Sequence, residues 1–134
     1  MDNKFVNNYN QDLSNLLNDI NVKDLNKSIE LIKRVKKKDA KIILAGNGGS
    51  AALSSHVAVD FTKTTKIRAI NFNEADLITC FANDYGYENW LSQALKSYAK
   101  KDDLVILVSS SGQSKNMINA ANFCKRQKIS LITF

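Results

Sequence analysis

The feature that most constrains the fold is a regular alternation of short apolar runs with segments of helical length. The strand candidates occupy residues 41–45, 68–72, 104–108 and 129–134, and those at 41–45 and 104–108 are continuous apolar runs rich in Ile, Leu and Val. Continuous apolar runs of this length are typical of parallel strands that are buried on both faces. The segments of helical length between the runs are residues 51–64, 74–81, 87–99 and 115–126. Because parallel strands need right-handed helical crossovers, the alternation predicts an α/β fold with three layers, in which an open parallel sheet lies between helices.

Two amphipathic helices are predicted before the alternating part. Apolar residues recur there at a spacing of three or four, with a break at Asn21. The two apolar stripes consist of Leu13, Leu16, Leu17 and Ile20, and of Leu25, Ile29, Ile32 and Val35. Neither helix can bury its stripe alone, so we expect both to dock on the rest of the domain or on another subunit.

The domain organisation follows from these elements. We predict a single domain over residues 1–134, with N-terminal helices in residues 1–38 and an α/β core in residues 41–134. A buried parallel strand at the end of the sequence would leave the sheet uncovered on one side. We therefore expect the chain to be a C-terminally truncated form of a longer protein.

Composition and charge exclude several classes of protein. A hydrophobic fraction of 44% and a charged fraction of 24% in 134 residues are ordinary for a globular domain. No apolar run approaches the ~20 residues of a membrane-spanning helix, and the N-terminus lacks a signal-peptide core, so we expect a cytoplasmic protein that does not enter a membrane.

The net charge of +6 owes much to the basic run 33–38, which contains no aromatic residue. Such a run is typical of a solvated helix end, so we expect no direct nucleic-acid binding. The two cysteines, Cys80 and Cys124, fit no metal or redox spacing.

Two loops carry the chemical signal, and each connects a predicted strand to a predicted helix. The glycine loop, Gly46-Asn47-Gly48-Gly49-Ser50, allows backbone N–H groups to approach a ligand at a helix N-terminus. The serine loop, Ser109-Ser110-Ser111-Gly112-Gln113-Ser114, adds hydroxyl groups at another helix N-terminus. Helix capping accounts for one of these serines but not for all of them. Because open α/β sheets bind ligands at the carboxyl ends of their strands, the two loops together predict a site for a phosphorylated small molecule.

A nucleotide site is the alternative interpretation of the glycine loop. No Gly-Lys-Ser/Thr sequence follows the loop, which argues against a Walker-type site. Gly46, Gly48 and Ala51 satisfy a permissive dinucleotide fingerprint, but the second strand ends in Asn71-Phe72-Asn73 and lacks the acidic residue that would bind a ribose. An NAD site would also leave the serine loop unexplained, so a sugar-phosphate site ranks above it.

Two polar pairs complete the set of candidate residues. His56 and Asp60 are four residues apart, so they share a face of the helix that follows the glycine loop. A His or an Asp on a helix is more often structural, and what favours a function here is the nearness of both to the predicted anion site. Asn83 and Asp84 lie in a turn predicted at residues 83–86, where these residue types are common for conformational reasons alone.

Taken together and in this order, the motifs resemble those of the sugar isomerase (SIS) domain family, and within it those of the phosphoheptose isomerases. The similarity covers essentially the whole chain and rests on both loops, on His56 with Asp60, and on the Ala-Asn-Asp-Tyr-Gly-Tyr sequence of residues 82–87. It implies an SIS-type fold, similar to flavodoxin and Rossmann folds. It also implies conversion of sedoheptulose 7-phosphate to D-glycero-D-manno-heptose 7-phosphate, which leads to ADP- or GDP-activated heptose for surface polysaccharides such as lipopolysaccharide. Members are homotetramers with their N-terminal helices packed together and their active sites between subunits.

The resemblance also assigns roles to individual residues. It places the phosphate at Ser109, Ser111 and Ser114, and the sugar at Asn47, Ser50 and Asp84. The other expected substrate contacts are Gly48, Gly49, Asn83 and Ser110. Asp60 takes the position of the family's catalytic glutamate, with a side chain one methylene shorter, and the family's catalytic histidine has no counterpart in this sequence. We therefore expect little or no turnover from these 134 residues alone.

Cofactors and other functions are also part of what the resemblance implies. The isomerisation requires no cofactor, although some members bind zinc, for which His56 is the one matching ligand. The competing hypothesis is a non-catalytic SIS module that binds a phosphosugar or, like one relative of the same fold, the replication initiator DnaA. A pure binding protein would have no reason to keep the carboxylate of Asp60.

Overall fold

The computed structural model describes residues 2–134, whose contacts divide the chain into two compact units. The unit that ends at Glu30 contains α1 (Asn3–Asn18) and the first part of α2 (Val22–Lys37). The unit Leu31–Phe134 contains the rest of α2 and the whole sheet. The predicted break at Asn21 is confirmed, because its side-chain oxygen accepts hydrogen bonds from the backbone N–H groups of Lys23 and Asp24 and so caps α2. Among the described residues, no helix has the length and apolar character needed to span a bilayer.

The first unit leaves its apolar stripe exposed. α1 buries none of its residues, and Leu16 and Leu17 are 69% and 60% exposed. Leu25 and Ile29, on the first part of α2, are also exposed. In the second unit the same α2 stripe continues with Ile32 and Val35, of which Val35 is buried against the sheet. The one buried residue of the α2 stripe, Val35, thus belongs to the larger unit.

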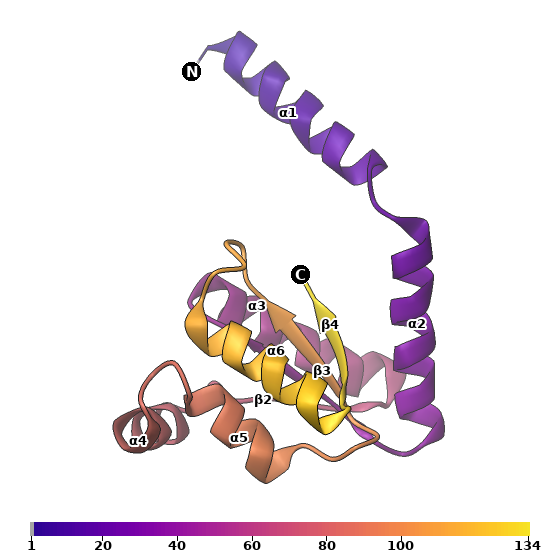
Figure 1. The fold of residues 1–134 in the computed structure, drawn as a ribbon. Helices are drawn as coiled ribbons and strands as arrows, with labels where there is room; N and C mark the ends of the chain where they lie inside the picture. The colour runs from indigo at the N-terminus through magenta and orange to yellow at the C-terminus, as the bar shows by residue number, and fades with distance from the viewer. Residues whose placement is uncertain (1) are drawn as a thin grey trace. The chain divides into compact units, whose positions relative to one another are not determined.

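The second unit is built on a parallel sheet of four strands in the order β2-β1-β3-β4 (Figure 1). The strands are β1 (Lys41–Gly46), β2 (Arg68–Asn71), β3 (Leu104–Val108) and β4 (Ser130–Thr133). All three neighbouring pairs are parallel, which confirms the predicted open α/β sheet. β1 and β3 are buried almost throughout because both are central strands.

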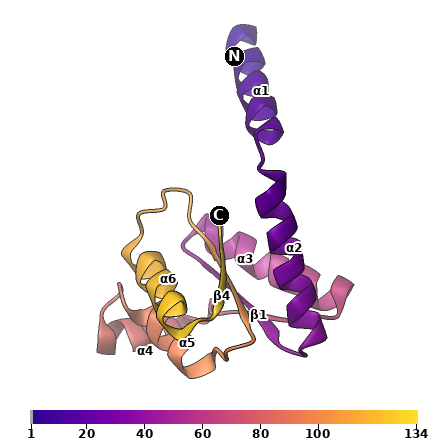
Figure 2. The same cartoon turned by 45° about the vertical axis from the view of Figure 1, so that its right-hand side comes forward.

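Helices cover both faces of the sheet (Figure 2). One face packs Ile42 and Leu44 against α3 (Gly49–Asp60), the single π-helical turn η1 (Phe61–Thr65) and the end of α2. The other face packs Ile43 and Ala45 against the remaining helices. These are α4 (Ala75–Tyr85), α5 (Trp90–Tyr98) and α6 (Lys115–Gln127). Successive side chains of β1 therefore point to opposite faces, and the predicted three layers are confirmed.

The turn predicted at residues 83–86 is wrong in most of its length. Asn83, Asp84 and Tyr85 belong to the last turn of α4, which ends only at Gly86. Gly86 has a φ of 81°, which is the left-handed region that glycine tolerates, and its N–H donates to the oxygen of Ala82. α4 therefore continues through Asn83 and Asp84 and ends only where Gly86 adopts a conformation that is not helical.

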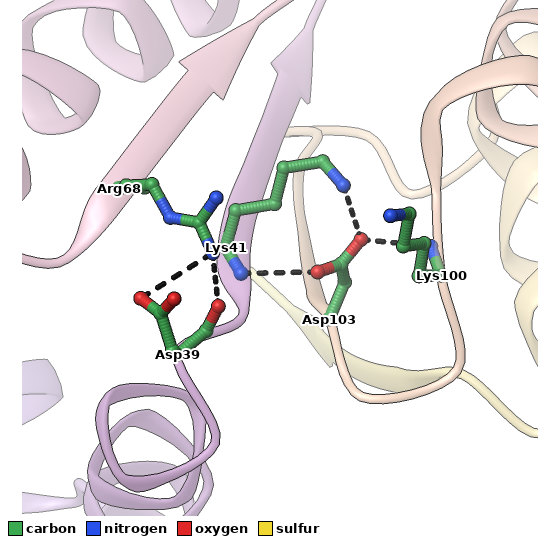
Figure 3. Close-up of polar contacts among 5 residues, drawn as sticks. All are labelled: Asp39, Lys41, Arg68, Lys100 and Asp103. Atoms are coloured by element: carbon green, nitrogen blue, oxygen red, sulfur yellow. Dashed lines mark hydrogen bonds and ion pairs between the residues drawn. The ribbon is translucent and has the colours of Figure 1, made fainter.

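The amino edge of the sheet, where the strands begin, is held by charged groups (Figure 3). Asp103, just before β3, is 2% exposed and forms an ion pair with the ammonium of Lys41 at the start of β1. Its carboxylate also accepts the backbone N–H of Lys41 at 3.0 Å and that of Lys100 at 2.7 Å. Beside it, Arg68 at the start of β2 pairs with Asp39. A buried carboxylate with three donors is well compensated, so these contacts secure the starts of the strands.

Candidate functional site

Strand register places the glycine loop and the serine loop side by side. Gly46, the last residue of β1, pairs with Val108, the last residue of β3, so both loops leave the sheet at the same level of its carboxyl edge. The glycine loop leads into α3 and the serine loop into α6. The sequence-based expectation that the two loops lie together is confirmed. The N-termini of two helices, where backbone donors and the positive ends of helix dipoles attract anions, thus meet at one edge.

The glycine loop is tight, and Gly46 is the residue that makes this possible. A Cβ at Gly46 would lie 2.6 Å from the backbone carbonyl carbon and oxygen of Ser50, so no other residue fits without moving the first turn of α3. Gly48 has a φ of 52°, a left-handed conformation. The backbone N–H of Ser50 donates to the oxygen of Asn47 at 3.0 Å, which closes the turn. Gly48 and Gly49 are exposed, and Asn47 and Ser50 are half-buried.

The serine loop is more open and keeps several hydroxyl groups at the surface. Ser110 and Ser111 are exposed, whereas Ser109 and Ser114 are half-buried. The Ser111 hydroxyl accepts the N–H of Gln113 at 3.2 Å. Ser114 occupies the N-cap position of α6, yet within the described part of the chain its side chain makes no capping hydrogen bond. Capping therefore does not account for Ser114, and its hydroxyl group is available to a ligand.

Side-chain hydrogen bonds join the glycine loop to the first turn of α6, which directly follows the serine loop. The Nδ2 of Asn47 donates to the Oδ1 of Asn116 at 3.0 Å, and the Nδ2 of Asn116 donates back to the Oδ1 of Asn47 at 2.8 Å. The hydroxyl of Tyr87 donates to the same Asn47 oxygen at 3.3 Å. Asn116 lies in the first turn of α6, directly after the serine loop, and is 2% exposed. The reciprocal pair fixes the separation of the two loops.

Asn116 was not predicted as a site residue, although a signal for it exists in the sequence, and Tyr87 was included only as part of the motif at residues 82–87. Asn116, Ala120 and Cys124 recur every four residues and form the buried stripe of α6. A polar residue within an otherwise apolar buried stripe must find a partner, which marks it as a candidate for a specific role. Tyr87 is the last residue of the motif at residues 82–87, but the sequence gives it no role of its own, because nothing local shows that its hydroxyl contacts Asn47.

A cavity of about 260 Å³ adjoins the serine loop. Ser109 and Gly112 line one part of it, and Leu107, Met117 and Phe134 supply apolar walls. It lies at the carboxyl ends of β3 and β4. A ligand held by the serine loop therefore meets an apolar surface as well as hydroxyl groups.

His56 and Asp60 are not brought to the two loops of their own chain. α3 runs away from the glycine loop, and at 1.5 Å per residue His56 and Asp60 lie about 10 Å and about 16 Å along the helix from Gly49. Their side chains are 77% and 58% exposed, and His56 Nε2 lies 3.5 Å from Asp60 Oδ2. The π-helical turn η1 begins directly after Asp60. The pair therefore forms a second, exposed polar cluster, separate from the loops.

Asn83 and Asp84 form a further exposed pair at the end of α4. Asn83 Nδ2 donates to Asp84 Oδ1 at 3.0 Å, and the Cys80 sulfur lies 3.9 Å from the other carboxylate oxygen of Asp84. The same segment continues to Tyr87, whose hydroxyl contacts Asn47. Asn119 of α6 also binds this segment, donating to the backbone oxygen of Glu88 at 2.9 Å. The α4–α5 connection thus borders the glycine loop.

The described residues do not by themselves fit a zinc centre. None of them form a group of three or more His, Cys, Asp or Glu side chains that would hold a metal ion. His56 and Asp60 supply two donor groups, whereas protein zinc sites usually have at least three protein ligands.

Comparison with known proteins adds a family and a set of relatives. Residues 5–134 match the family described as the SIS domain. Phosphoheptose isomerase 2 of Campylobacter jejuni is 39% identical over 110 residues, which are 78% of this chain and 54% of that protein. Phosphoheptose isomerase of Thermodesulfovibrio yellowstonii is 32% identical over 120 residues, which are 85% of this chain and 60% of that protein. The chain thus spans little more than half the length of these curated relatives.

Solved structures show the same fold. Phosphoheptose isomerase GmhA from Neisseria gonorrhoeae matches 97% of this chain and 72% of its own chain, with a TM-score of 0.86 and 25% sequence identity. A phosphoheptose isomerase from Francisella tularensis matches with a TM-score of 0.85 over 97% of this chain, at 16% identity, and supports the fold alone.

Proposed function

Since this chain belongs to the SIS domain family, we propose that it forms the phosphosugar-binding part of an aldose–ketose isomerase acting on sedoheptulose 7-phosphate. The product is D-glycero-D-manno-heptose 7-phosphate. The observation that carries the proposal is the pairing of the glycine loop with the serine loop at one edge of the sheet, joined by Asn47 and Asn116. The names of the relatives from Campylobacter jejuni and Thermodesulfovibrio yellowstonii support the same activity.

The two loops have complementary tasks in this proposal. The hydroxyls of Ser109, Ser111 and Ser114 and the N-terminus of α6 bind the phosphate, because hydroxyl donors and a helix N-terminus both favour an anion. Asn47 and Ser50 of the glycine loop bind hydroxyl or carbonyl oxygens of the sugar. Asp84, at the end of α4, binds the sugar from the neighbouring segment.

Proton transfer is assigned to Asp60. The base removes a proton from carbon 1 of the ketose, the electron pair forms the carbon 1–carbon 2 double bond, and oxygen 2 gains a proton to give the ene-diol. Oxygen 1 then loses its proton and carbon 2 receives one, which completes the aldose. The phosphate is on carbon 7, so the reacting carbons lie at the opposite end of the sugar from the serine loop.

A site shared between copies of the chain would bring Asp60 to the sugar. Asp60 lies about 16 Å along α3 from the glycine loop of its own chain, so an Asp60 from a second copy is the one that we assign to the reaction. The exposed stripe of α1, with Leu13, Leu16 and Leu17, and the exposed Ile20 that follows the helix support self-association, and we propose a homotetramer.

The proposed cellular setting is the cytoplasm, where the product would enter heptose synthesis for surface polysaccharides. Cys80 and Cys124 are both free thiols, as is usual in a reducing compartment. Zinc binding at His56 stays a prediction, which metal analysis of the purified protein by mass spectrometry would test.

The experiment is an isomerase and binding assay with sedoheptulose 7-phosphate. We expect the 134-residue chain to bind the phosphosugar and to turn it over little, because His56 is its one histidine and the family's second acid–base group has no counterpart. We expect Ser111→Ala to weaken binding about tenfold, as loss of a hydrogen bond to a charged group predicts. Ser97→Ala, on exposed α5 surface, is the matched control. Unchanged affinity of Ser111→Ala, or no binding by the unaltered chain, would reject the proposal.

A non-catalytic module is the second candidate, and the distance of Asp60 from the loops favours it. Such a protein would bind a phosphosugar, or the initiator DnaA, without isomerase activity in any assembled form. Capture of DnaA together with the absence of any thermal shift on adding sedoheptulose 7-phosphate would support it over the isomerase.

A further inference from the structure

Asn116 is a buried polar residue beside the two loops that the proposed reaction does not use. It is 2% exposed and belongs to the buried stripe of α6. Burying an amide is unfavourable unless its donors and acceptors are bonded. Its side chain donates one hydrogen bond to Asn47 and accepts one from it, and Asn47 lies 69 residues away on the glycine loop. The side-chain hydrogen bonds of the buried Asn116 therefore hold the glycine loop through Asn47.

The hydrogen bonds of Asn47 leave little freedom for its side chain. An amide oxygen accepts two hydrogen bonds and an amide nitrogen donates two. The Oδ1 of Asn47 accepts from Asn116 Nδ2 at 2.8 Å and from the Tyr87 hydroxyl at 3.3 Å. Its Nδ2 gives one hydrogen to Asn116 Oδ1 at 3.0 Å. One N–H of the side chain thus remains for a ligand.

We propose that Asn116 is a positioning residue with two effects on the site. It orients the Asn47 amide so that this side chain offers a ligand a single N–H donor and no acceptor. It also ties the glycine loop to the serine loop, so that both loops contact the same molecule. The ligand half of this inference rests on the proposed function, whereas the coupling of the loops does not.

The inference restricts the ligand group that Asn47 binds. Because its oxygen is occupied by two donors, Asn47 binds an oxygen that accepts, such as a carbonyl or a hydroxyl lone pair. The Asn47 side chain does not accept a hydrogen bond from a ligand hydroxyl. A sugar phosphate that spans both loops uses this donor, whereas inorganic phosphate at the serine loop does not reach it.

The coupling is tested without ligand by hydrogen–deuterium exchange of the full chain. We expect Asn116→Ala and Asn116→Leu to speed exchange of backbone N–H groups in residues 47–51 and 109–114 at least threefold, with β1 and β3 unchanged. Asn116→Leu removes both hydrogen bonds while nearly filling the space, so it separates lost bonding from a cavity. Asn119→Ala is the matched control, since Asn119 lies three residues on in α6 and bonds Glu88 and Asn89 instead. Equal exchange in the loops of the Asn116 variants and the control would overturn the coupling.

The ligand half is tested by comparing two probes by calorimetry. We expect Asn116→Ala to weaken sedoheptulose 7-phosphate binding roughly 10- to 100-fold, and inorganic phosphate binding less than twofold. If Asn116→Ala only damaged the structure, it would weaken the binding of both probes equally, and Asn119→Ala would weaken binding as well. Either result would overturn the positioning role. If the unaltered chain binds phosphate but not the phosphosugar, the proposed substrate is wrong, and the exchange experiment still decides the coupling.

Discussion

The two edges of the sheet differ in how their polar groups are used. At the amino edge, the buried Asp103 carboxylate binds Lys41 and the backbone of Lys100, so its acceptors are occupied within the chain. At the carboxyl edge, the loops are joined by the neutral Asn47–Asn116 pair, and exposed serine hydroxyls remain around it. An edge with occupied polar groups holds the fold together, whereas an edge with remaining donors can bind a ligand. The comparison predicts that stability and binding respond to different substitutions.

The largest expected effect is at the amino edge. Asp103→Ala leaves the Lys41 ammonium without its carboxylate, so we expect the free energy of unfolding to fall by about 3–5 kcal/mol. Urea denaturation measures this loss, and Asp102→Ala, which changes the exposed neighbouring carboxylate, is the control. Phosphosugar affinity of the folded fraction should stay the same. A large loss of affinity would show that the two edges are not independent.

Gly46→Ala breaks the carboxyl edge by crowding. The new Cβ would lie 2.6 Å from the Ser50 backbone, so we expect a loss of about 1–3 kcal/mol in stability, together with the loss of phosphosugar binding. Gly49→Ala is the matched control, because a Cβ there meets no atom within 4 Å and the residue is helical. Thermal melts compare the two variants. Equal melting temperatures would contradict the close approach of α3 to β1.

Ser114→Ala sharpens the difference between structural and binding roles. A serine that caps a helix contributes about 1 kcal/mol, but Ser114 makes no capping bond within the described residues. We therefore expect stability to change by less than about 0.5 kcal/mol and phosphosugar affinity to fall about tenfold. Calorimetry and urea denaturation measure both quantities. A loss confined to stability would make Ser114 an ordinary cap.

The smallest effect concerns Cys124, which lies in the core away from both edges. Burial raises the pKa of its thiol from 9.0 to about 11, so at pH 8 its thiolate fraction is about 100-fold lower than that of an ordinary thiol. We expect a thiol reagent at pH 8 to label exposed Cys80 quickly and Cys124 only after unfolding. Because the folded pKa is raised, the thiol's contribution to stability is complete below pH 9 and is lost as the pH rises through 11. Rapid labelling of Cys124 in the native state would contradict its burial.

Much of the fold was predictable because its signals are local. The apolar runs that became β1 and β3, and the stripes of α1 and α2, are patterns that a few neighbouring residues establish. The turn expected at Asn83 and Asp84 was wrong. These residue types favour turns, but they did not end α4, which continues to Tyr85 and is ended by Gly86. The nearness of the two loops followed from a topological rule, namely that the carboxyl ends of parallel strands share one edge.

The candidate site was predictable only in part. The glycine loop and the serine loop stand out in the sequence by composition, and the structure places them together. Asn116 did not stand out, and Tyr87 did so only as part of the motif at residues 82–87, because the role of each depends on a contact with Asn47 across the fold. His56 and Asp60 stood out by spacing, yet their distance from the loops depends on the direction in which α3 runs.

The sequence by itself determined the elements, the order of strands and helices, and the chemical character of each loop, because periodicity and residue type act over short stretches of chain. Only the tertiary structure decided which polar groups are occupied and which remain for a ligand. That distinction depends on partners such as Asn47 and Asn116, which are 69 residues apart and meet only when β1 and β3 pair in register. Hydrogen bonding requires atoms within about 3 Å of each other, and no local pattern specifies such a distance between remote residues.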